Sequence, residues 1–217
     1  MFVLFLSLLL SMNGALASAP FYVIEVVEGP CDILAAAGNP CVAAHSTVRA
    51  LFSAYSGPLY NVTRSSDGLS ANISVLSPGG FANATAHDVF CAKLDCVISQ
   101  VFDQSPMRNH LHQRHQLVNA SRHRILVGDN IPVYGMYFDP GFGYHQDNTT
   151  GIVTGNDPES IYAVMSGKHY NDKCCFDYGN SETDDTSDGA GSMEGAFSWR
   201  VTPRYSHTHT KKNTQHT

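Results

Sequence analysis

The sequence contains little charge and few long apolar segments. Asp, Glu, Lys and Arg make up only 15% of its 217 residues, and the formal net charge is −6. This acidic balance argues against a nucleic-acid partner, because binding to phosphates needs clustered Lys and Arg. Beyond residue 20 no segment is long and apolar enough for a transmembrane helix, so we expect no membrane partner. Helical periodicity is scarce and no internal repeat occurs, which leaves little support for a mainly helical fold.

The first twenty residues contain the one long apolar run of the sequence. Residues 2–10 are almost wholly apolar, and Ala15-Leu16-Ala17 has the small-x-small pattern of a cleavage site. The run is too short to span a bilayer core of roughly 30 Å. It therefore predicts a signal peptide over residues 1–19 and a secreted, extracellular protein.

Five N-x-[ST] sequons agree with a glycosylated extracellular surface. One such pattern is common by chance, but five behind a signal peptide are informative. The predicted acceptors are Asn61, Asn72, Asn83, Asn119 and Asn148.

Six cysteines form an even set, as expected in an oxidising compartment. They are Cys31, Cys41, Cys91, Cys96, Cys174 and Cys175. Two pairs each bracket a short loop, so spacing favours disulfides across 31–41 and 91–96. The adjacent Cys174 and Cys175 can bond to each other, to separate partners or to a metal. Their spacing does not match structural zinc sites, and the residues alone leave the two disulfide alternatives open.

Gly and Pro are plentiful, and short β-like runs recur between turn signals, which together predict a single all-β domain. The expected strands are 21–27, 58–63, 73–77, 96–102, 131–138, 160–166 and 194–199. One segment, 41–55, is the best helix candidate. His45, Ser46 and Thr47 can cap it, and its apolar residues from Val48 to Tyr55 fall on one face.

Two segments lack acidic residues altogether. Residues 106–125 are rich in Arg and His, and residues 198–217 form a basic, His/Thr-rich ending that we expect to be a disordered tail. Within the first segment, His110, His112 and His115 give an H-x-H-x2-H pattern that can bind zinc. An irregular insertion is the favoured interpretation, and we expect no metal site.

Several long motifs carry a family resemblance. From residue 29 the chain reads GPCDILAAAGNPCVAAHSTVRALFSAYSGPLYNVTR, followed in order by ISVLSPGGFANA, VFDQSPMRNHL, PGFGY and IYAVMSGKHYNDKCCFDYGNSET. Together they resemble fungal α-L-arabinofuranosidase B, glycoside hydrolase family 54. The HYNxxCCFDYGN stretch is the most distinctive, and the resemblance spans roughly residues 29–197.

The resemblance implies a jelly-roll-like β-sandwich catalytic domain, present here as an incomplete portion over residues 20–197. It implies a monomeric secreted glycosidase that removes terminal α-L-arabinofuranosyl groups from plant cell-wall polysaccharides such as arabinoxylan and arabinan. The mechanism implied is retaining, which uses two carboxyl groups about 5–5.5 Å apart. No metal or organic cofactor is implied. The alternative is a truncated, inactive remnant or an arabinose-binding fragment.

The resemblance also implies site residues. In the family the adjacent cysteines bond to each other and form part of the sugar pocket, so Cys174 and Cys175 are the expected substrate-binding pair. Asp177 and Tyr178 follow directly and are expected to line the same pocket. The family's nucleophile glutamate and acid/base aspartate lie in D-x-E-N-G-like and G-G-D-N-like stretches that do not occur in this sequence, so no catalytic residue is assigned and low activity is expected.

For three other polar residues we favour a structural role over a functional one. His45 can act as a general base but is expected to be structural. Asp103 and Gln104 precede a turn and are expected to hydrogen-bond to it.

Overall fold

The computed structural model describes residues 27–154, 157–166, 168, 176–180, 195–198 and 209–210. For residues 176–177, 195–198 and 209–210 only the backbone is described. The expected signal peptide, almost all of the expected strand at 21–27, and Cys174 and Cys175 lie outside the described residues.

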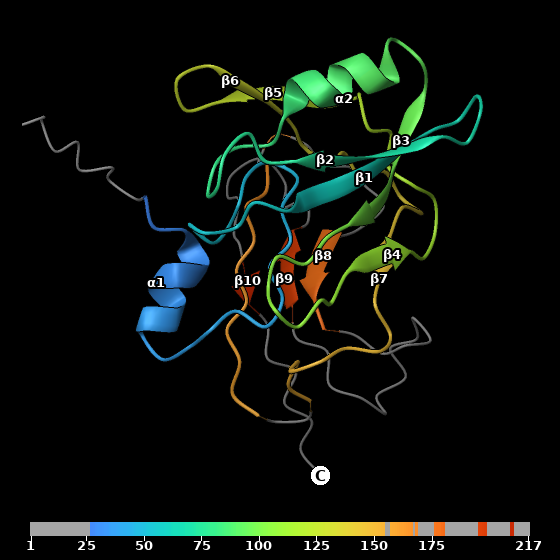
Figure 1. Ribbon diagram of the computed structural model, residues 1–217. Coiled ribbons are helices and arrows are strands. Elements are labelled where there is room, and N and C mark those ends of the chain that lie inside the picture. The colour runs from blue at the N-terminus through green and yellow to red at the C-terminus, as the bar shows by residue number, and fades with distance from the viewer. Residues whose placement is uncertain are drawn as a thin grey trace, which may run out of the picture.

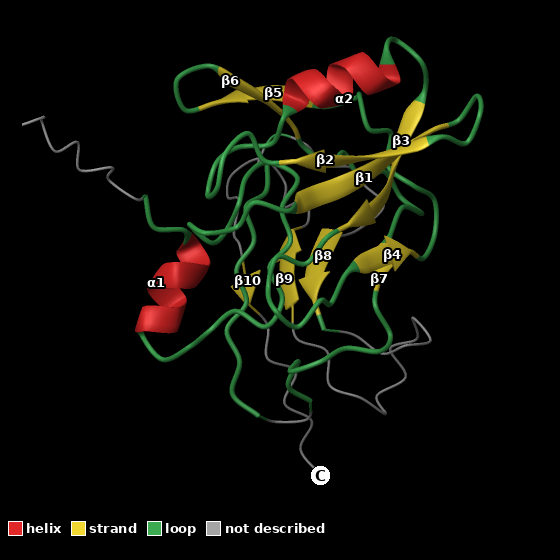
Figure 2. Ribbon diagram, in the orientation of Figure 1, coloured by secondary structure: helices red, strands yellow, loops and turns green. Residues whose placement is uncertain are grey.

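The described part consists mainly of antiparallel strands, as in a β-sandwich (Figures 1 and 2). The largest sheet has the order β2-β1-β3-β4-β7, made of β1 (Pro58–Arg64), β2 (Ser70–Ser74), β3 (Cys96–Val101), β4 (Leu111–Gln113) and β7 (Tyr144–His145). A hairpin pairs β5 (Arg124–Val127) with β6 (Ile131–Tyr134), and a second sheet contains β8 (Phe176–Gly179), β9 (Gly195–Ser198) and β10 (His209–Thr210). Among the described residues the two helices are α1 (Pro30–Ala36) and α2 (Ala84–Cys91).

The elements form layers around the largest sheet. Figure 1 shows α2 and the β5–β6 hairpin on one side of β1, β2 and β3, with β8 and β9 on the other side. No helix among the described residues is long and apolar enough to cross a membrane.

The core lies between the largest sheet, α2 and the hairpin. In β1, Tyr60 and Val62 are fully buried, whereas Asn61 and Thr63 between and after them are half-buried. Such alternation places one apolar face inward and the polar face outward. Leu59 is also buried next to Tyr60, because the register shifts at this point of β1. Apolar side chains from other elements complete the core: Ile73, Ile98, Val101, Val118 and Val133.

Two disulfides join neighbouring segments. Cys31 in α1 bonds to Cys41, and Cys91 at the end of α2 bonds to Cys96 at the start of β3. Both are the pairs that spacing favours. Bridges of this kind stabilise mainly by restricting the unfolded chain, and they are typical of proteins from oxidising compartments.

The helix expected over 41–55 is wrong. Apart from a single turn in which Tyr55 N–H donates to the Phe52 carbonyl, the bonds between backbone groups of this segment and other backbone groups reach distant residues: Ala50 N–H donates to Gly80, and the carbonyl of Leu51 accepts from Cys31. Ser46 does act as a local cap, since its Oγ accepts from the amides of Val48 and Arg49, but no helix follows. Tertiary pairing has overridden the local apolar pattern.

Both observed helices occur where no helix was expected, and both begin with capping interactions. At α1, Pro30 occupies the first turn and the Asp32 carboxylate accepts from Gly29 N–H at 2.8 Å. At α2, the Asn83 side chain accepts from Ala86 N–H at 2.9 Å. These caps satisfy amides that a helix start leaves unpaired, which lets short helices form.

The predicted strands agree with the structure where the segment pairs with a neighbouring strand. Residues 58–63 and 96–102 correspond closely to β1 and β3, while the expected strands at 73–77 and 131–138 overlap β2 and β6 only in part. The strand expected over 160–166 is wrong. Side-chain exposure alternates there as in an extended chain, but within the described residues this segment has no ladder partner.

The ending expected to be disordered contains two described residues. His209 and Thr210 form β10, whose backbone pairs with Phe197 and Ala196 of β9. The structure therefore differs from the expectation at these two positions.

Candidate functional site

The predicted sugar-pocket residues fall on or beside β8. Cys174 and Cys175 lie outside the described residues. Asp177 is a β8 residue whose backbone pairs with Phe197 of β9. Tyr178 is the one of the four whose side chain is described, and it provides the geometry from which the site can be built.

The Tyr178 hydroxyl contacts His45. Its oxygen lies 2.9 Å from His45 Nδ1, and the two rings meet edge to face with centroids 6.0 Å apart. On the other side of the imidazole, Nε2 lies 2.7 Å from the backbone oxygen of Asn109. A carbonyl oxygen only accepts, so Nε2 carries the proton and Nδ1 accepts from the Tyr178 hydroxyl. The contact therefore specifies one neutral tautomer of His45.

The electrostatic environment supports the same protonation states. Burial lowers the pKa of His45, against the opposing effects of the Asn109 carbonyl and the Asp103 charge. Burial raises the pKa of Tyr178 to about 12, and the negative charge of Asp103 adds to the increase. At neutral pH the tyrosine is a hydroxyl donor and the histidine a neutral acceptor. His45 has both nitrogens engaged, in agreement with the structural role expected for it.

Asp103 organises the loop that carries Asn109. Its side chain is almost fully buried, and its oxygens accept four hydrogen bonds. Oδ1 accepts from the amides of Ala44 and Ser105 at 2.7 and 2.9 Å. Oδ2 accepts from Ser105 Oγ and the Asn109 amide at 2.6 and 2.8 Å. A carboxylate saturated with donors has no free lone pair aimed at a substrate, so we interpret Asp103 as structural.

Asn109 is equally well satisfied. Its Nδ2 donates to the carbonyls of Val42 and Thr150, and its Oδ1 accepts from Thr150 N–H. Because the side chain is buried, each of these bonds replaces one that water would otherwise supply. These bonds hold Asn109 in place, so its backbone carbonyl, which accepts the hydrogen bond from His45 Nε2–H, has a fixed position.

Gln104 fixes the 42–51 segment from the same loop. Its Oε1 accepts from Leu51 N–H at 2.6 Å, and its Nε2 donates to the Arg49 carbonyl. Asp103 therefore bonds to its own turn, as expected, and also to Ala44. The expectation for Gln104 is wrong, because its side chain bonds to Leu51 and Arg49 and not to the turn. The chain of contacts from Asp103 through Asn109 and His45 ends at the Tyr178 hydroxyl.

Near β8 lie further polar groups that the sequence does not predict as site residues. Asn180, just after β8, donates from Nδ2 to Glu159 Oε1 at 3.1 Å and to the Val153 carbonyl. The charge of Tyr162 adds to the increase in the pKa of Tyr178, after burial and Asp103. Nothing in the local sequence marks Glu159 as a neighbour of Asn180, because the two residues are 21 positions apart in the chain.

The histidine pattern at 110–115 does not converge. His110 Nδ1 accepts from the Asp103 amide at 3.0 Å, whereas His112 Nδ1 lies 3.4 Å from Gln100 Nε2 on the neighbouring strand. In the part of the chain that the structure describes, no group of three or more His, Cys, Asp or Glu side chains is placed to hold a metal ion.

The five sequons occupy different environments. Asn61 lies mid-strand in β1 and is half-buried, and its Nδ2 donates to Asn72 Oδ1 at 2.7 Å. Asn83 is the half-buried N-cap of α2. Asn119 and Asn148 lie in exposed positions outside the named strands.

Comparison with known proteins identifies the family. A family model described as "Alpha-L-arabinofuranosidase B, catalytic" matches residues 30–209. The chain belongs to this family. The match extends past the boundary expected at residue 197. Two curated members of the arabinofuranosidase B family are similar: the probable alpha-L-arabinofuranosidase B of Aspergillus fumigatus, 48% identical over 185 residues, and the alpha-L-arabinofuranosidase B of Aspergillus niger, 45% identical over 185 residues.

Solved structures of arabinofuranosidases share the fold. One is a GH54 α-L-arabinofuranosidase soaked with a cyclic sulfate inhibitor, with 44% sequence identity and a TM-score of 0.77 over 81% of this chain. Another is an arabinofuranosidase complexed with arabinofuranosyl-α-1,2-xylobiose, with 44% identity and a TM-score of 0.76. The alignments cover 79% of this chain but only 36–37% of the two curated relatives, and 39% of each solved chain.

Proposed function

We propose that this chain contributes the sugar-binding part of a secreted α-L-arabinofuranosidase, which removes terminal α-L-arabinofuranosyl groups with retention of configuration. The observation that carries the proposal is the family match over residues 30–209, which includes the CCFDYGN stretch. The named relatives favour a hydrolase over an inactive, arabinose-binding remnant. The substrate class is arabinose-containing oligosaccharides, and within it the arabinoxylan and arabinan of plant cell walls.

We further propose that Cys174, Cys175 and Asp177 line the pocket and that Tyr178 positions it. Adjacent cysteines joined to each other offer a stiff, polarizable surface against the less polar face of a furanose. The Tyr178 hydroxyl is engaged by His45, so its contribution is the placement of β8, which begins at Phe176 directly after the cysteines. Retaining hydrolysis needs two carboxyl groups, and we do not assign either of them to a residue of this sequence.

The remaining features of the proposal concern the whole protein. Residues 1–19 direct secretion, residues 20–197 form part of the catalytic β-sandwich, and residues 198–217 form a basic ending. The protein acts as a monomer and needs no metal or organic cofactor. The two described disulfides support an oxidising compartment.

Two measurements on the secreted protein test the function. The first is release of 4-nitrophenol from 4-nitrophenyl α-L-arabinofuranoside, and the second is calorimetric binding of an arabinofuranosyl-xylobiose. Release together with binding supports the hydrolase. Binding without release supports the arabinose-binding alternative and overturns hydrolysis by this chain on its own, and absence of both overturns the whole proposal.

The pocket assignment has its own test. Mass mapping of non-reduced peptides should find Cys174 bonded to Cys175. In parallel, Tyr178→Phe should weaken arabinofuranoside binding about threefold to tenfold, as expected for loss of one positioning hydrogen bond. Tyr137→Phe is the matched control, because the Tyr137 ring packs on Arg122 instead of His45. Equal binding by Tyr178→Phe and the control would refute the positioning role.

A further inference from the structure

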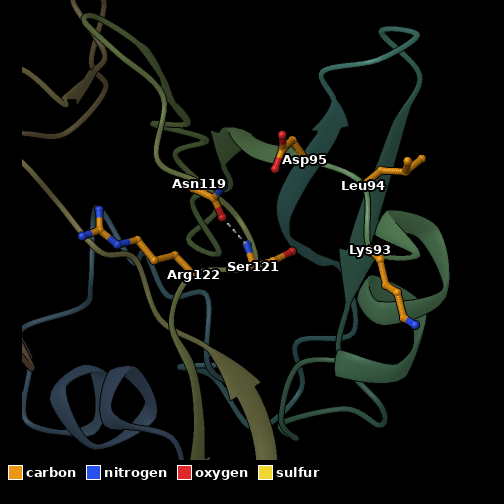
Figure 3. Close-up of a pocket in the computed structure, with 6 residues that line it drawn as sticks. All are labelled: Lys93, Leu94, Asp95, Asn119, Ser121 and Arg122. Carbon is orange, nitrogen blue, oxygen red and sulfur yellow. Dashed lines mark hydrogen bonds between the residues drawn. The ribbon is translucent and has the colours of Figure 1, made fainter.

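An open hollow lies between the turn closed by the second disulfide and the loop that follows Val118. Its volume is about 460 Å³, and it is broadly open to solvent. Figure 3 shows the side chains that line it: Lys93, Leu94, Asp95, Asn119, Ser121 and Arg122. One of these, Asn119, is the acceptor of an Asn119-Ala-Ser sequon.

Asn119 is held rigidly with its side chain outward. Val118 and Ala120 on either side are fully buried, and both bond to β3: the Val118 carbonyl accepts from Ile98 N–H, and Ala120 N–H donates to the Cys96 carbonyl. Between them Asn119 pairs with Val97 as an isolated bridge. Because side chains alternate along an extended segment, the two buried neighbours force Asn119 to the surface.

The Asn119 amide is presented with its nitrogen available for modification. Its Oδ1 accepts a hydrogen bond from Ser121 N–H at 3.0 Å, drawn as the dashed line in Figure 3. That bond fixes the amide plane through its oxygen, whereas N-glycosylation takes place at Nδ2. The sequon hydroxyl of Ser121 belongs to the same exposed loop.

The opposite wall of the hollow is a constrained turn. Ala92 and Lys93 both have positive φ, of 41° and 69°, inside the loop that Cys91–Cys96 closes. The Asp95 carbonyl accepts from Ser65 N–H at 2.8 Å, which ties the turn to the residue that follows β1. Leu94 is 42% exposed, so an apolar side chain stands beside a carboxylate at the rim. The wall is thus fixed in place and offers both apolar and polar contacts.

We propose that Asn119 carries an N-linked glycan whose first N-acetylglucosamine occupies this hollow. Leu94 would contact the acetamide methyl group, and the Asp95 carboxylate would accept from sugar hydroxyls. In the transfer step, Asn119 Nδ2 attacks C1 of the first sugar of a lipid diphosphate-linked oligosaccharide. The new N–C1 bond replaces the C1–O bond, the lipid diphosphate leaves as an anion, and the proton that Nδ2 loses passes to solvent.

Asn61 provides an internal contrast. Its Nδ2 donates to Asn72 across the sheet, and its Oδ1 accepts from Ser99 Oγ at 2.6 Å. A glycan on that nitrogen would have to displace the bond to Asn72, whereas a glycan on Asn119 displaces none of the contacts described above.

The experiment uses the full chain secreted from yeast, with Ser121→Ala as the test variant. This substitution removes the sequon but keeps the Ser121 backbone N–H that bonds Asn119. Peptide mapping after enzymatic deglycosylation in ¹⁸O-water should show Asn119 converted to labelled aspartate. Unlabelled Asn119 in the wild-type protein would overturn the proposal.

Seating of the sugar is tested by native cleavage after the exposed Lys93 with a lysine-specific protease. Cleavage of the Ser121→Ala variant should be roughly fivefold faster than that of the wild type, because protein surface covered by a sugar resists proteolysis. Trimming the wild-type glycan to its first sugar should preserve the protection. Thr85→Ala, which removes the sequon of Asn83 on α2, should leave the rate unchanged. Equal rates for wild type and Ser121→Ala would refute the seating.

Discussion

The contact between Tyr178 and His45 allows a quantitative test of how β8 is held. Replacing Tyr178 by Phe removes a hydroxyl 2.9 Å from His45 Nδ1 and leaves that nitrogen without its donor. A hydrogen bond contributes about 0.5–1.5 kcal/mol, and an orphaned buried acceptor costs about 1–3 kcal/mol. Both side chains are half-buried, so water can reach part of the gap. We therefore predict a loss of about 1–2 kcal/mol in the free energy of unfolding.

Urea unfolding at pH 7 measures this loss in a double-mutant cycle. The variants are Tyr178→Phe, His45→Leu and the double variant, with Tyr137→Phe as control. The coupling free energy between Tyr178 and His45 should be about 1 kcal/mol at unchanged m. A coupling below roughly 0.3 kcal/mol, which is the usual error of additivity, would refute the assigned contact.

The same coupling should depend on pH with a defined sign. The pKa of His45 is lowered in the folded protein, so the neutral form that accepts from Tyr178 is the native one. The contribution is present above the unfolded histidine pKa of about 6.5 and is lost as the pH falls through the lower folded pKa. Repeating the cycle at acidic pH should give a smaller coupling. A coupling that grows on acidification would contradict the tautomer assigned to His45.

Three further predictions concern the scaffold. His87 is fully buried, and burial lowers its pKa to about 4. The free energy of unfolding should therefore fall by roughly 3 kcal/mol between pH 6.5 and 4. In urea titrations, His87→Phe should remove that part of the pH dependence. Asp103→Asn replaces one acceptor oxygen by a donor, orphans two of its four partners, and should lower the free energy of unfolding by about 2–4 kcal/mol; a loss under about 1 kcal/mol would contradict the assigned bonds. Gly29→Ala would place a Cβ 2.2 Å from the Leu51 carbonyl oxygen and should cost more than about 2 kcal/mol in thermal unfolding. Gly38→Ala meets no atom within 4 Å but has a φ of +82°, so it should cost only about 1 kcal/mol and serves as the matched control.

The sequence predicts the fold best where the local apolar pattern agrees with the pairing that the segment adopts. Strands β1 and β3 carry the alternation of a half-buried sheet, and β3 follows the second disulfide turn directly. The 41–55 segment has a helical apolar pattern, yet its backbone pairs with residues such as Gly80 and Asp103. No local signal encodes those partners, so propensity alone could not place the segment.

The candidate site illustrates the same limit. Family resemblance points to Tyr178, but its partner His45 is 133 positions away in the chain, and Asn109 is 64 positions from His45. His45 is expected to be structural because of its place at a helix start, but that helix does not exist, and its ring nitrogens contact Tyr178 and Asn109 instead. Only the folded arrangement shows that both imidazole nitrogens are engaged.

The saturated carboxylate of Asp103 has a consequence for local opening of the protein. The amide protons of Ala44, Ser105 and Asn109 come from two separate stretches of chain but end on the same two oxygen atoms. Withdrawal of that one side chain would release all three at once, so their exchange with deuterated solvent should proceed at matched rates with one shared opening free energy. A single acidic group would then make two stretches, distant in the chain, open as one cooperative unit.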